Sequence, residues 1–482
     1  MSSYGAHGGR GWRGSRPFIG STPSAPTGRG RGGFAPRGGR GALGHSWGKR
    51  KPQNVPDTSL HPLGKLLTTF NNSHLDMVVG SSSDVASIAN CKYVASYNWL
   101  NERTPTIIVP GKPPLWTPLK EPQRLKEDKG EYFRDPNAAR FPRYPTEPAV
   151  QAILKSDTDF PTLSIDIFAC GSTMGNLLRF VRFIDKPFRF HVEVVGNTVF
   201  FVRKENAPKE LIPDVRGFGH SFPESYTTWE RDVGGSETHQ RLVEYVFAGL
   251  KCLIRFGCDG YHGNLASRSV TGNPAPDMAS DPVDLIEALE ATLVGETLSD
   301  PDNSLNVRTG GTQVPQQSIF DLKTRSGRFG SEIDMEDIIP LLWIRQIPNF
   351  IVAYHDGAGL FQDIKVKDVQ KDVRDWETEN QTALKRLEVL LHKIIEFAKA
   401  DGEGLVEVYC PSVDQLEIRK RFGDGSEALP PSLKSRWEGL SHEVDAEKSK
   451  TGIHSLYDYD EKDGSGDFTA CSEECGYCGQ CS

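Results

Sequence analysis

The sequence lacks any apolar run of the roughly 18 to 20 residues that a membrane-spanning helix needs, so we expect no membrane partner. The N-terminus also lacks an apolar signal core, and we therefore expect the protein in the nucleus or the cytoplasm. Acidic residues are missing from residues 1–56, which hold ten Lys and Arg, whereas the rest of the chain carries 46 basic and 64 acidic residues. A basic segment on an acidic body is typical of a protein that associates with nucleic acid.

Residues 1–56 have low sequence complexity, with Arg-Gly repeats such as "RGRGGFAPRGGRG" and few apolar side chains. Glycine opposes helix formation, and the apolar area is too small to offset the loss of chain entropy on folding. Because arginine pairs with phosphates and stacks on bases, we interpret this segment as a disordered RNA-binding arm. The alternative is a solubilising linker. The candidate RNA-binding residues are Arg29, Arg31, Arg37 and Arg40.

The body of the chain, residues 57–410, alternates predicted strands with predicted helices, which indicates a mixed α/β domain. Apolar runs and alternation predict a β-hairpin over 188–205 and strands over 163–171, 250–261, 350–355 and 404–410. Helical periodicity and caps predict helices over 172–184, 236–247, 336–350 and 380–402. We expect irregular structure over 57–145 and a surface insertion over 262–313 that contains one further helix, 283–294.

Beyond residue 410 the sequence turns polar, so we expect an acidic flexible segment over 411–464 and a separate Cys-rich motif over 465–482. Four of the nine cysteines of the chain fall within eleven residues of this motif. Four thiolates satisfy tetrahedral Zn²⁺, and an iron–sulfur cluster is the other metal reading. Free thiols in a disordered tail are the third interpretation. The four residues are Cys471, Cys475, Cys478 and Cys481.

A candidate catalytic site begins with "IFDLK", residues 319–323, in which an apolar pair is followed by Asp321 and Lys323. On a strand, residues i and i+2 point to the same face, so these two side chains lie side by side. One interpretation is a surface ion pair on an edge strand. The other is the acid-x-lysine half of a metal-dependent nuclease site. A second acid, Asp259, ends the strand predicted over 250–261, and two carboxylates together bind Mg²⁺ or Mn²⁺.

In the nuclease interpretation the metal lowers the pKa of a bound water and neutralises charge that develops on phosphate. Lys323 orients or deprotonates that water. Gln346 supplies a neutral hydrogen bond to the same water or to the substrate.

The order of these elements resembles the decapping exoribonuclease (DXO/Rai-type) family of the PD-(D/E)XK nuclease superfamily, over roughly residues 132–409. The segment "IFDLKTRS" is similar to that family's strand ending Glu-Leu-Lys-Thr, with Asp321 in place of Glu. "LLWIRQIPNF" resembles its Trp-x-x-Gln helix, and "LIRFGCDGY" lies where the family has Glu-x-Asp. Two departures stand out, because Gly257 replaces the Glu of Glu-x-Asp and Cys170 replaces an Arg that precedes Gly171.

The helix predicted over 236–247 lies where the family has a helix with a metal-site Glu, which corresponds to Glu244, with Glu237 as the alternative on the same helix. The resemblance implies a PD-(D/E)XK-type mixed sheet flanked by helices. It implies catalytic roles for Asp259, Asp321, Lys323, Gln346 and Glu244, and metal binding by Asp259, Asp321 and Glu244.

The activity that the resemblance implies is metal-dependent hydrolysis, as in mRNA decapping, of incompletely or non-canonically capped RNA 5′ ends. Removal of pyrophosphate and 5′–3′ exoribonuclease action are included in that class. The implied partners are RNA 5′ ends and a 5′–3′ exoribonuclease. Because Gly257 and Cys170 depart from the family pattern, the alternative is a catalytically silent RNA-binding adaptor of the same fold.

Overall fold

The computed structural model describes residues 56–79, 85–212, 215–269, 305–327, 332–423 and 427–439. The chain divides into two units, residues 1–51 and 52–482, and every described residue belongs to the second unit. The predicted Arg-Gly arm with its four candidate arginines, the helix predicted over 283–294 and the four C-terminal cysteines lie outside the described residues.

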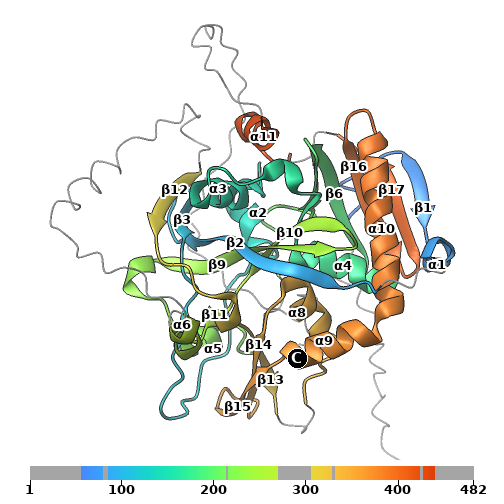
Figure 1. The fold of residues 1–482 in the computed structure, drawn as a ribbon. Coiled ribbons are helices and arrows are strands. Elements are labelled where there is room, and N and C mark those ends of the chain that lie inside the picture. The colour runs from blue at the N-terminus through green and yellow to red at the C-terminus, as the bar shows by residue number, and fades with distance from the viewer. Residues whose placement is uncertain are drawn as a thin grey trace, which may run out of the picture. The chain divides into compact units, whose positions relative to one another are not determined.

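An eleven-stranded mixed sheet forms the larger part of the fold (Figure 1). Parallel pairs join β5 to both β7 and β10, while antiparallel hairpins join β6 to β7, β9 to β10 and β16 to β17. In spatial order the strands are β1 (Leu66–Phe70), β17 (Gln415–Lys420), β16 (Leu405–Ser412), β6 (Phe188–Val195), β7 (Thr198–Arg203), β5 (Ile167–Cys170), β10 (Leu250–Gly257), β9 (Ser236–Phe247), β2 (Ile88–Leu100), β3 (Thr106–Pro110) and β12 (Asn306–Gly310).

A smaller six-stranded sheet carries the acid-x-lysine segment. Its strand β13 pairs in parallel with β14 and antiparallel with β11, so β13 is an interior strand. In spatial order the strands are β15 (Phe361–Asp368), β14 (Asn349–His355), β13 (Ile319–Ser326), β11 (Gly260–Tyr261), β4 (Leu115–Trp116) and β8 (Thr227–Thr228). The short connection from β10 to β11 therefore leads the chain directly from the large sheet into the small one.

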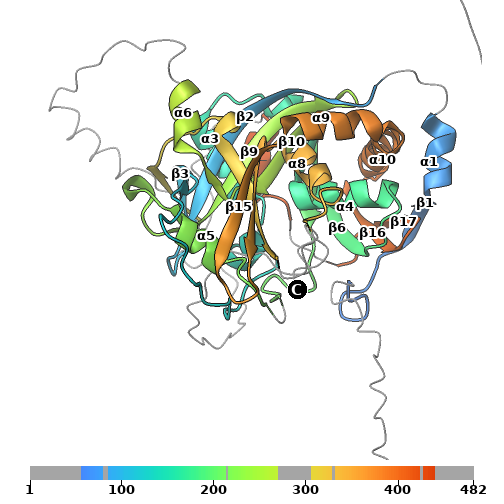
Figure 2. The same cartoon turned by 90° about the horizontal axis from the view of Figure 1, so that it is seen from below.

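Helices pack on both faces of the large sheet, because its buried strands present apolar side chains to both sides. One core joins the sheet to α4, α8 and α10, and a second core on the opposite face joins it to α3 and α11. Figure 2 shows α4, α8, α9 and α10 together on one side of the strands. The helices are α1 (Asn72–Val79), α2 (Pro136–Arg140), α3 (Glu147–Ser156), α4 (Gly171–Val181), α5 (Ser221–Tyr226), α6 (Gly263–Ser269), α8 (Ile339–Arg345), α9 (Gln370–Glu379), α10 (Gln381–Ala400) and α11 (Pro431–Trp437). The predicted mixed α/β fold with helices flanking the sheets is confirmed.

One predicted helix is wrong, since residues 236–247 form strand β9. β9 lies between β10 and β2 and is hydrogen-bonded along both edges. A strand in this position is buried on both faces and therefore lacks the polar alternation that identifies a half-exposed strand. The turn into β10 passes through Ala248 and Gly249, both with positive φ, which closes the hairpin.

Three predicted boundaries also differ from the structure. The segment expected to be irregular, 57–145, contains β2, a thirteen-residue strand of the large sheet. The end of the expected insertion forms β12, which pairs with β3. The domain continues past residue 410 through β17 and α11, which pack on the same sheet and core. Among the described residues no helix has the length and apolar character required to cross a membrane.

Candidate active site

The two candidate aspartates face each other because of the register between β11 and β13. These strands are antiparallel, with Gly260 opposite Phe320, and one further step in the same register places Asp259 opposite Asp321. The Oδ2 atom of Asp259 accepts a hydrogen bond of 2.7 Å from the backbone N–H of Leu322. A Cβ atom at Gly260 would lie 2.3 Å from the ring of Phe320, so glycine permits the close approach of the strands.

The Asp321 carboxyl carries an unfavourable charge when it is ionised. Burial is the main reason that its pKa is raised well above the ordinary value, and the negative charge of Asp259 raises it further. The positive charges of Lys323 and Arg345 act in the opposite direction. Asp321 is 4% exposed, and its Oδ2 atom accepts a hydrogen bond of 3.2 Å from Nη1 of Arg345. A pair of carboxylates that repel each other in a buried site is stabilised by a bound cation.

Lys323 is held beside the acids by the same strand. It follows Asp321 by two residues on β13, so both side chains point to the same face. Lys323 is 5% exposed, and β13 has a neighbouring strand on each side. The interpretation as a surface ion pair on an edge strand is therefore wrong, and the structure brings Asp259, Asp321 and Lys323 together at one cavity.

That cavity has a volume of about 380 Å³ and lies where the two sheets meet the start of α4. Its walls include the ends of β9 and β10, the middle of β13, and residues of α5 and α8. The lining holds nine Lys and Arg against seven Asp and Glu, among them Arg179, Lys186, Arg203, Lys204 and Arg255. The positive surplus suits an anionic ligand, in contrast to the acidic composition of the chain as a whole.

Cys170 ends β5 and precedes α4 at the cavity wall. Its Sγ atom lies 3.1 Å from the hydroxyl oxygens of both Ser172 and Thr173. Burial alone would raise the pKa of the Cys170 thiol, but the guanidinium groups of Arg255 and Arg203, with the two hydroxyls, lower it. The thiol of Cys170 therefore loses its proton more readily than its buried position alone would allow.

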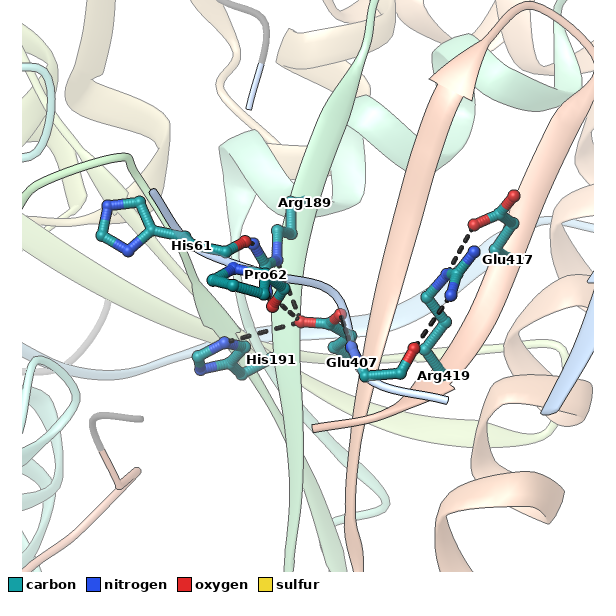
Figure 3. Close-up of polar contacts among 8 residues, drawn as sticks. His61, Pro62, Arg189, His191, Glu407, Glu417 and Arg419 are labelled. Carbon is teal, nitrogen blue, oxygen red and sulfur yellow. Dashed lines mark hydrogen bonds and ion pairs between the residues drawn. The ribbon is translucent and has the colours of Figure 1, made fainter. Parts of the chain in front are cut away.

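A buried ion pair holds Arg189, another residue of the cavity lining. Figure 3 shows its contacts. Nε and Nη2 of Arg189 donate to Oε2 of Glu407 at 2.9 and 2.6 Å, and the same guanidinium donates to the carbonyl oxygens of His61 and Pro62. Burial, followed by nearby positive side chains, lowers the pKa of His191 to about 3, so this ring is neutral although it lies 3.9 Å from Glu407. The pair attaches the segment around residue 62 to β6 and β16.

Two predicted site residues do not line the cavity with the aspartates. Glu244 lies within β9 and forms an ion pair of 3.2 Å with Lys92 of the neighbouring strand β2. Gln346 ends α8 with a left-handed backbone conformation. Its side-chain amide donates a hydrogen bond of 2.6 Å to the carbonyl oxygen of Trp343 in the same helix. The predicted helix over 236–247 caused the first error, since a strand directs every second side chain to the opposite face.

The cavity also includes charged residues that the sequence analysis did not assign to a site. Glu224 of α5 is one such residue. Glu237 of β9, which the sequence offered as the alternative to Glu244, also lines the cavity and forms an ion pair with Arg140. Arg345 of α8 is the residue that contacts Asp321. The sequence offered one indication of this role, because Arg345 occupies a position of its helix where apolar residues are expected. A charged residue at such a position needs a buried partner.

The donor set fits a hard divalent cation. Asp259 and Asp321 provide carboxylate oxygens, which Mg²⁺ and Mn²⁺ prefer. Among the residues with described positions, no cluster of three Asp, Glu, His or Cys side chains has the arrangement of a metal site. Two carboxylates suffice for Mg²⁺ when water and substrate phosphates complete the coordination. The raised pKa of Asp321 shows that added positive charge would favour its ionised form.

A family model described as a domain of unknown function, DUF8563, matches residues 70–435 of the sequence. The chain belongs to this family. The matched range begins at the end of β1 and ends within α11, so it contains nearly all of the described fold. A search of curated protein sequences finds no match.

Solved structures with a similar fold include three fungal proteins. Scheffersomyces stipitis Rai1, in complex with (3′-NADP)+ and calcium ion, is 11% identical with a TM-score of 0.47 and covers 78% of this chain and 99% of its own. Candida albicans Rai1, in complex with pU5 and Mn²⁺, is 9% identical with a TM-score of 0.45 and covers 79% and 100%. K. lactis Dxo1, in complex with manganese, is 8% identical with a TM-score of 0.42 and covers 74% and 99%. The similarity to these three proteins is one of fold, at a sequence identity of 8 to 11%.

Proposed function

We propose that this protein is a metal-dependent hydrolase that acts on the 5′ ends of RNA. The observation that supports the proposal is the opposition of Asp259 and Asp321 beside Lys323 at the wall of a cavity with a positive surplus. Asp321 and Lys323 are buried there, and Asp259 is partly buried. A phosphate-containing substrate matches the charge of the cavity, and two carboxylates match a hard cation. The sequence resemblance to the decapping exoribonucleases supplies the substrate class.

Each residue has a chemical role in this proposal. A bound Mg²⁺ or Mn²⁺ supplies a polarised water and stabilises charge on the phosphate. Asp259 and Asp321 hold that cation, and the hydrogen bond from the backbone of Leu322 fixes the orientation of the Asp259 carboxylate. Lys323 projects into the same space and is placed to hold the attacking water or its proton. Arg345 and the other cations of the lining orient the substrate phosphates.

The basic segment 1–56 complements the cavity in this proposal. Its arginines bind RNA through phosphates without regard to sequence, which raises the concentration of RNA ends near the cavity. Specificity for a 5′ end then comes from the cavity, since a terminal phosphate or cap enters a recess more readily than the middle of a chain.

A second candidate is an RNA-binding adaptor of the same fold without catalysis. Within the described part of the chain no third metal ligand joins the two aspartates. At Gly257, where the family has Glu, a Cβ atom would have only Nε2 of Gln240 within 4 Å, at 3.6 Å. If the protein is an adaptor, we expect it to bind RNA with a steep salt dependence and without turnover.

Incubation with RNAs that differ only at the 5′ end separates the two candidates. The set carries triphosphate, monophosphate, unmethylated cap, methylated cap and NAD ends, with Mg²⁺ or Mn²⁺ present. We expect metal-dependent product from at least one RNA, and a loss of at least about 100-fold in Asp321→Asn and Lys323→Met with RNA binding retained. The control is Asp356→Asn, an exposed acid paired with Arg124 outside the cavity lining. Intact RNA in every reaction, with binding retained, would favour the adaptor.

A further inference from the structure

We propose, on the basis of the function inferred for this site, that a divalent metal and a substrate phosphate bind together, and that Arg345 exchanges Asp321 for the phosphate as they bind. The contact that points to this exchange is the ion pair of 3.2 Å between Nη1 of Arg345 and Oδ2 of Asp321. In that contact Arg345 holds an oxygen of one of the two candidate metal ligands.

The charges around Asp321 balance in the form of the site that binds a metal, in which both carboxyls are ionised. When both carboxyls are ionised, Asp259 and Asp321 carry two negative charges, and Lys323 and Arg345 carry two positive charges. A divalent cation would leave a surplus of two positive charges in a buried site, where uncompensated charge is costly. A terminal phosphate carries close to two negative charges near pH 7. Metal and phosphate together therefore restore the balance that either one alone would disturb.

The number of ligands leads to the same conclusion. The two aspartates are the acids that the strand register brings face to face, and the described residues include no three-ligand cluster. Mg²⁺ requires six ligands and is commonly bound through one or two carboxylates together with substrate phosphates. Phosphate oxygens would thus complete the coordination as well as the charge.

Arg345 is positioned to make the exchange over a short distance. Its side chain passes close to the first residue of α4, where a Cβ atom at Gly171 would lie 3.1 Å from Nε and 3.2 Å from Cγ of Arg345. Both residues line the cavity, and the Arg345 side chain is 15% exposed. A guanidinium presents five N–H donors in a planar fork that matches phosphate as well as carboxylate. It can therefore turn from Asp321 to a phosphate in the cavity.

Binding of Mn²⁺ to the full-length protein, followed by the electron paramagnetic resonance signal of free Mn²⁺, tests this coupling without a measurement of activity. Titrations are made alone, with adenosine 5′-monophosphate and with adenosine. The variants are Arg345→Gln, Arg345→Lys and Arg386→Gln. Arg386 is a matched control, because its side chain is also 15% exposed and ion-paired, to Asp76, but lies outside the cavity lining.

For the wild type and Arg386→Gln we expect adenosine 5′-monophosphate to raise Mn²⁺ affinity about tenfold, and adenosine to have no effect. Arg345→Gln removes the competing charge, so it should bind Mn²⁺ alone about threefold or more tightly and lose most of the nucleotide effect. Arg345→Lys keeps the charge and should bind Mn²⁺ alone as the wild type does, which distinguishes charge from a loss of structure.

An equal Mn²⁺ affinity with and without the nucleotide, or an undiminished nucleotide effect in Arg345→Gln, would overturn the proposal. If Mn²⁺ binds and RNA is hydrolysed under those conditions, the proposed function stands while the exchange is wrong. Absence of Mn²⁺ binding even with the nucleotide would contradict both.

Discussion

Replacement of Asp321 by Asn should stabilise the metal-free protein at neutral pH while it removes hydrolysis. The raised pKa means that the folded protein keeps a proton on Asp321 at a pH where the unfolded chain, with a pKa of about 3.9, has lost it. Stability from this group is therefore complete below about pH 4 and is lost as the pH rises toward the pKa of the folded state. Asn carries no charge and retains an oxygen that accepts from Arg345.

The size of this effect follows from linkage. Each unit by which the folded pKa exceeds the unfolded value corresponds to about 1.4 kcal/mol of unfolding free energy. Urea unfolding of wild type and Asp321→Asn between pH 4 and 8, with a chelator present, should give curves that coincide near pH 4 and separate by about that amount per pH unit above it. The separation ends when the pH reaches the folded pKa.

Asp128 provides a buried control with the opposite sign. Burial raises its pKa, but hydrogen bonds from His220 and Ser221 lower it overall. The Asp128 carboxylate accepts a hydrogen bond of 2.9 Å from the backbone N–H of each of these two residues. Asp128→Asn should therefore destabilise the protein at neutral pH, and the difference should shrink as the pH falls below about 4. If Asp321→Asn follows the wild-type curve at every pH, or behaves as Asp128→Asn does, the charge arrangement inferred for the site is wrong.

Gly257→Glu adds a carboxylate to the cavity wall that Asp259 also lines, in open space beside Gln240. Mn²⁺ affinity should therefore rise by about tenfold, equal to about 1.4 kcal/mol, in a titration against the wild type, and unchanged affinity would mean that this position does not reach the metal. Glu407→Ala leaves the Arg189 guanidinium buried without its carboxylate, and urea unfolding should show a loss of about 3 to 5 kcal/mol, whereas a loss below about 1 kcal/mol would contradict the account of that pair. His191→Asn removes a base whose pKa is lowered to about 3 mainly by burial. The wild type should lose unfolding free energy as the pH falls below about 6.5, and this variant should lose less. If the two curves of unfolding free energy against pH are parallel, His191 is not the cause of the loss.

The core of the candidate site was predictable from sequence because each acid ends an apolar run. Asp321 and Lys323 share a face through the period of two of any strand, whatever the tertiary structure. The opposition of Asp259 and Asp321 depends on the register of β11 against β13, across about sixty residues of chain. The order of strands and helices along the sequence suggested that the two aspartates lie close together. The hydrophobic periodicity of each segment alone did not determine their opposition.

The errors concern residues whose positions depend on distant segments. Residues 236–247 were predicted as a helix because a strand that is covered on both faces has no polar alternation. Its partner strand β2, whose pairing identifies it as a strand, lies some 150 residues earlier in the chain. Glu244 was consequently assigned to the wrong place. Gln346 was assigned for the hydrogen bonds its amide can make and from the resemblance, whereas that amide donates to the carbonyl oxygen of Trp343 at the end of α8. The sequence marks Arg345 as a charged residue among apolar positions, but its partner, Asp321 of β13, is identified only by the tertiary structure.

Diffraction at the manganese absorption edge, from crystals grown with Mn²⁺ and adenosine 5′-monophosphate, would show whether Asp259 and Asp321 hold a divalent metal together with a phosphate. We expect an anomalous peak between the two carboxylates, within about 2.0 to 2.6 Å of their oxygens, with a phosphate beside it. A peak elsewhere, or no peak in a crystal that contains the nucleotide, would contradict it.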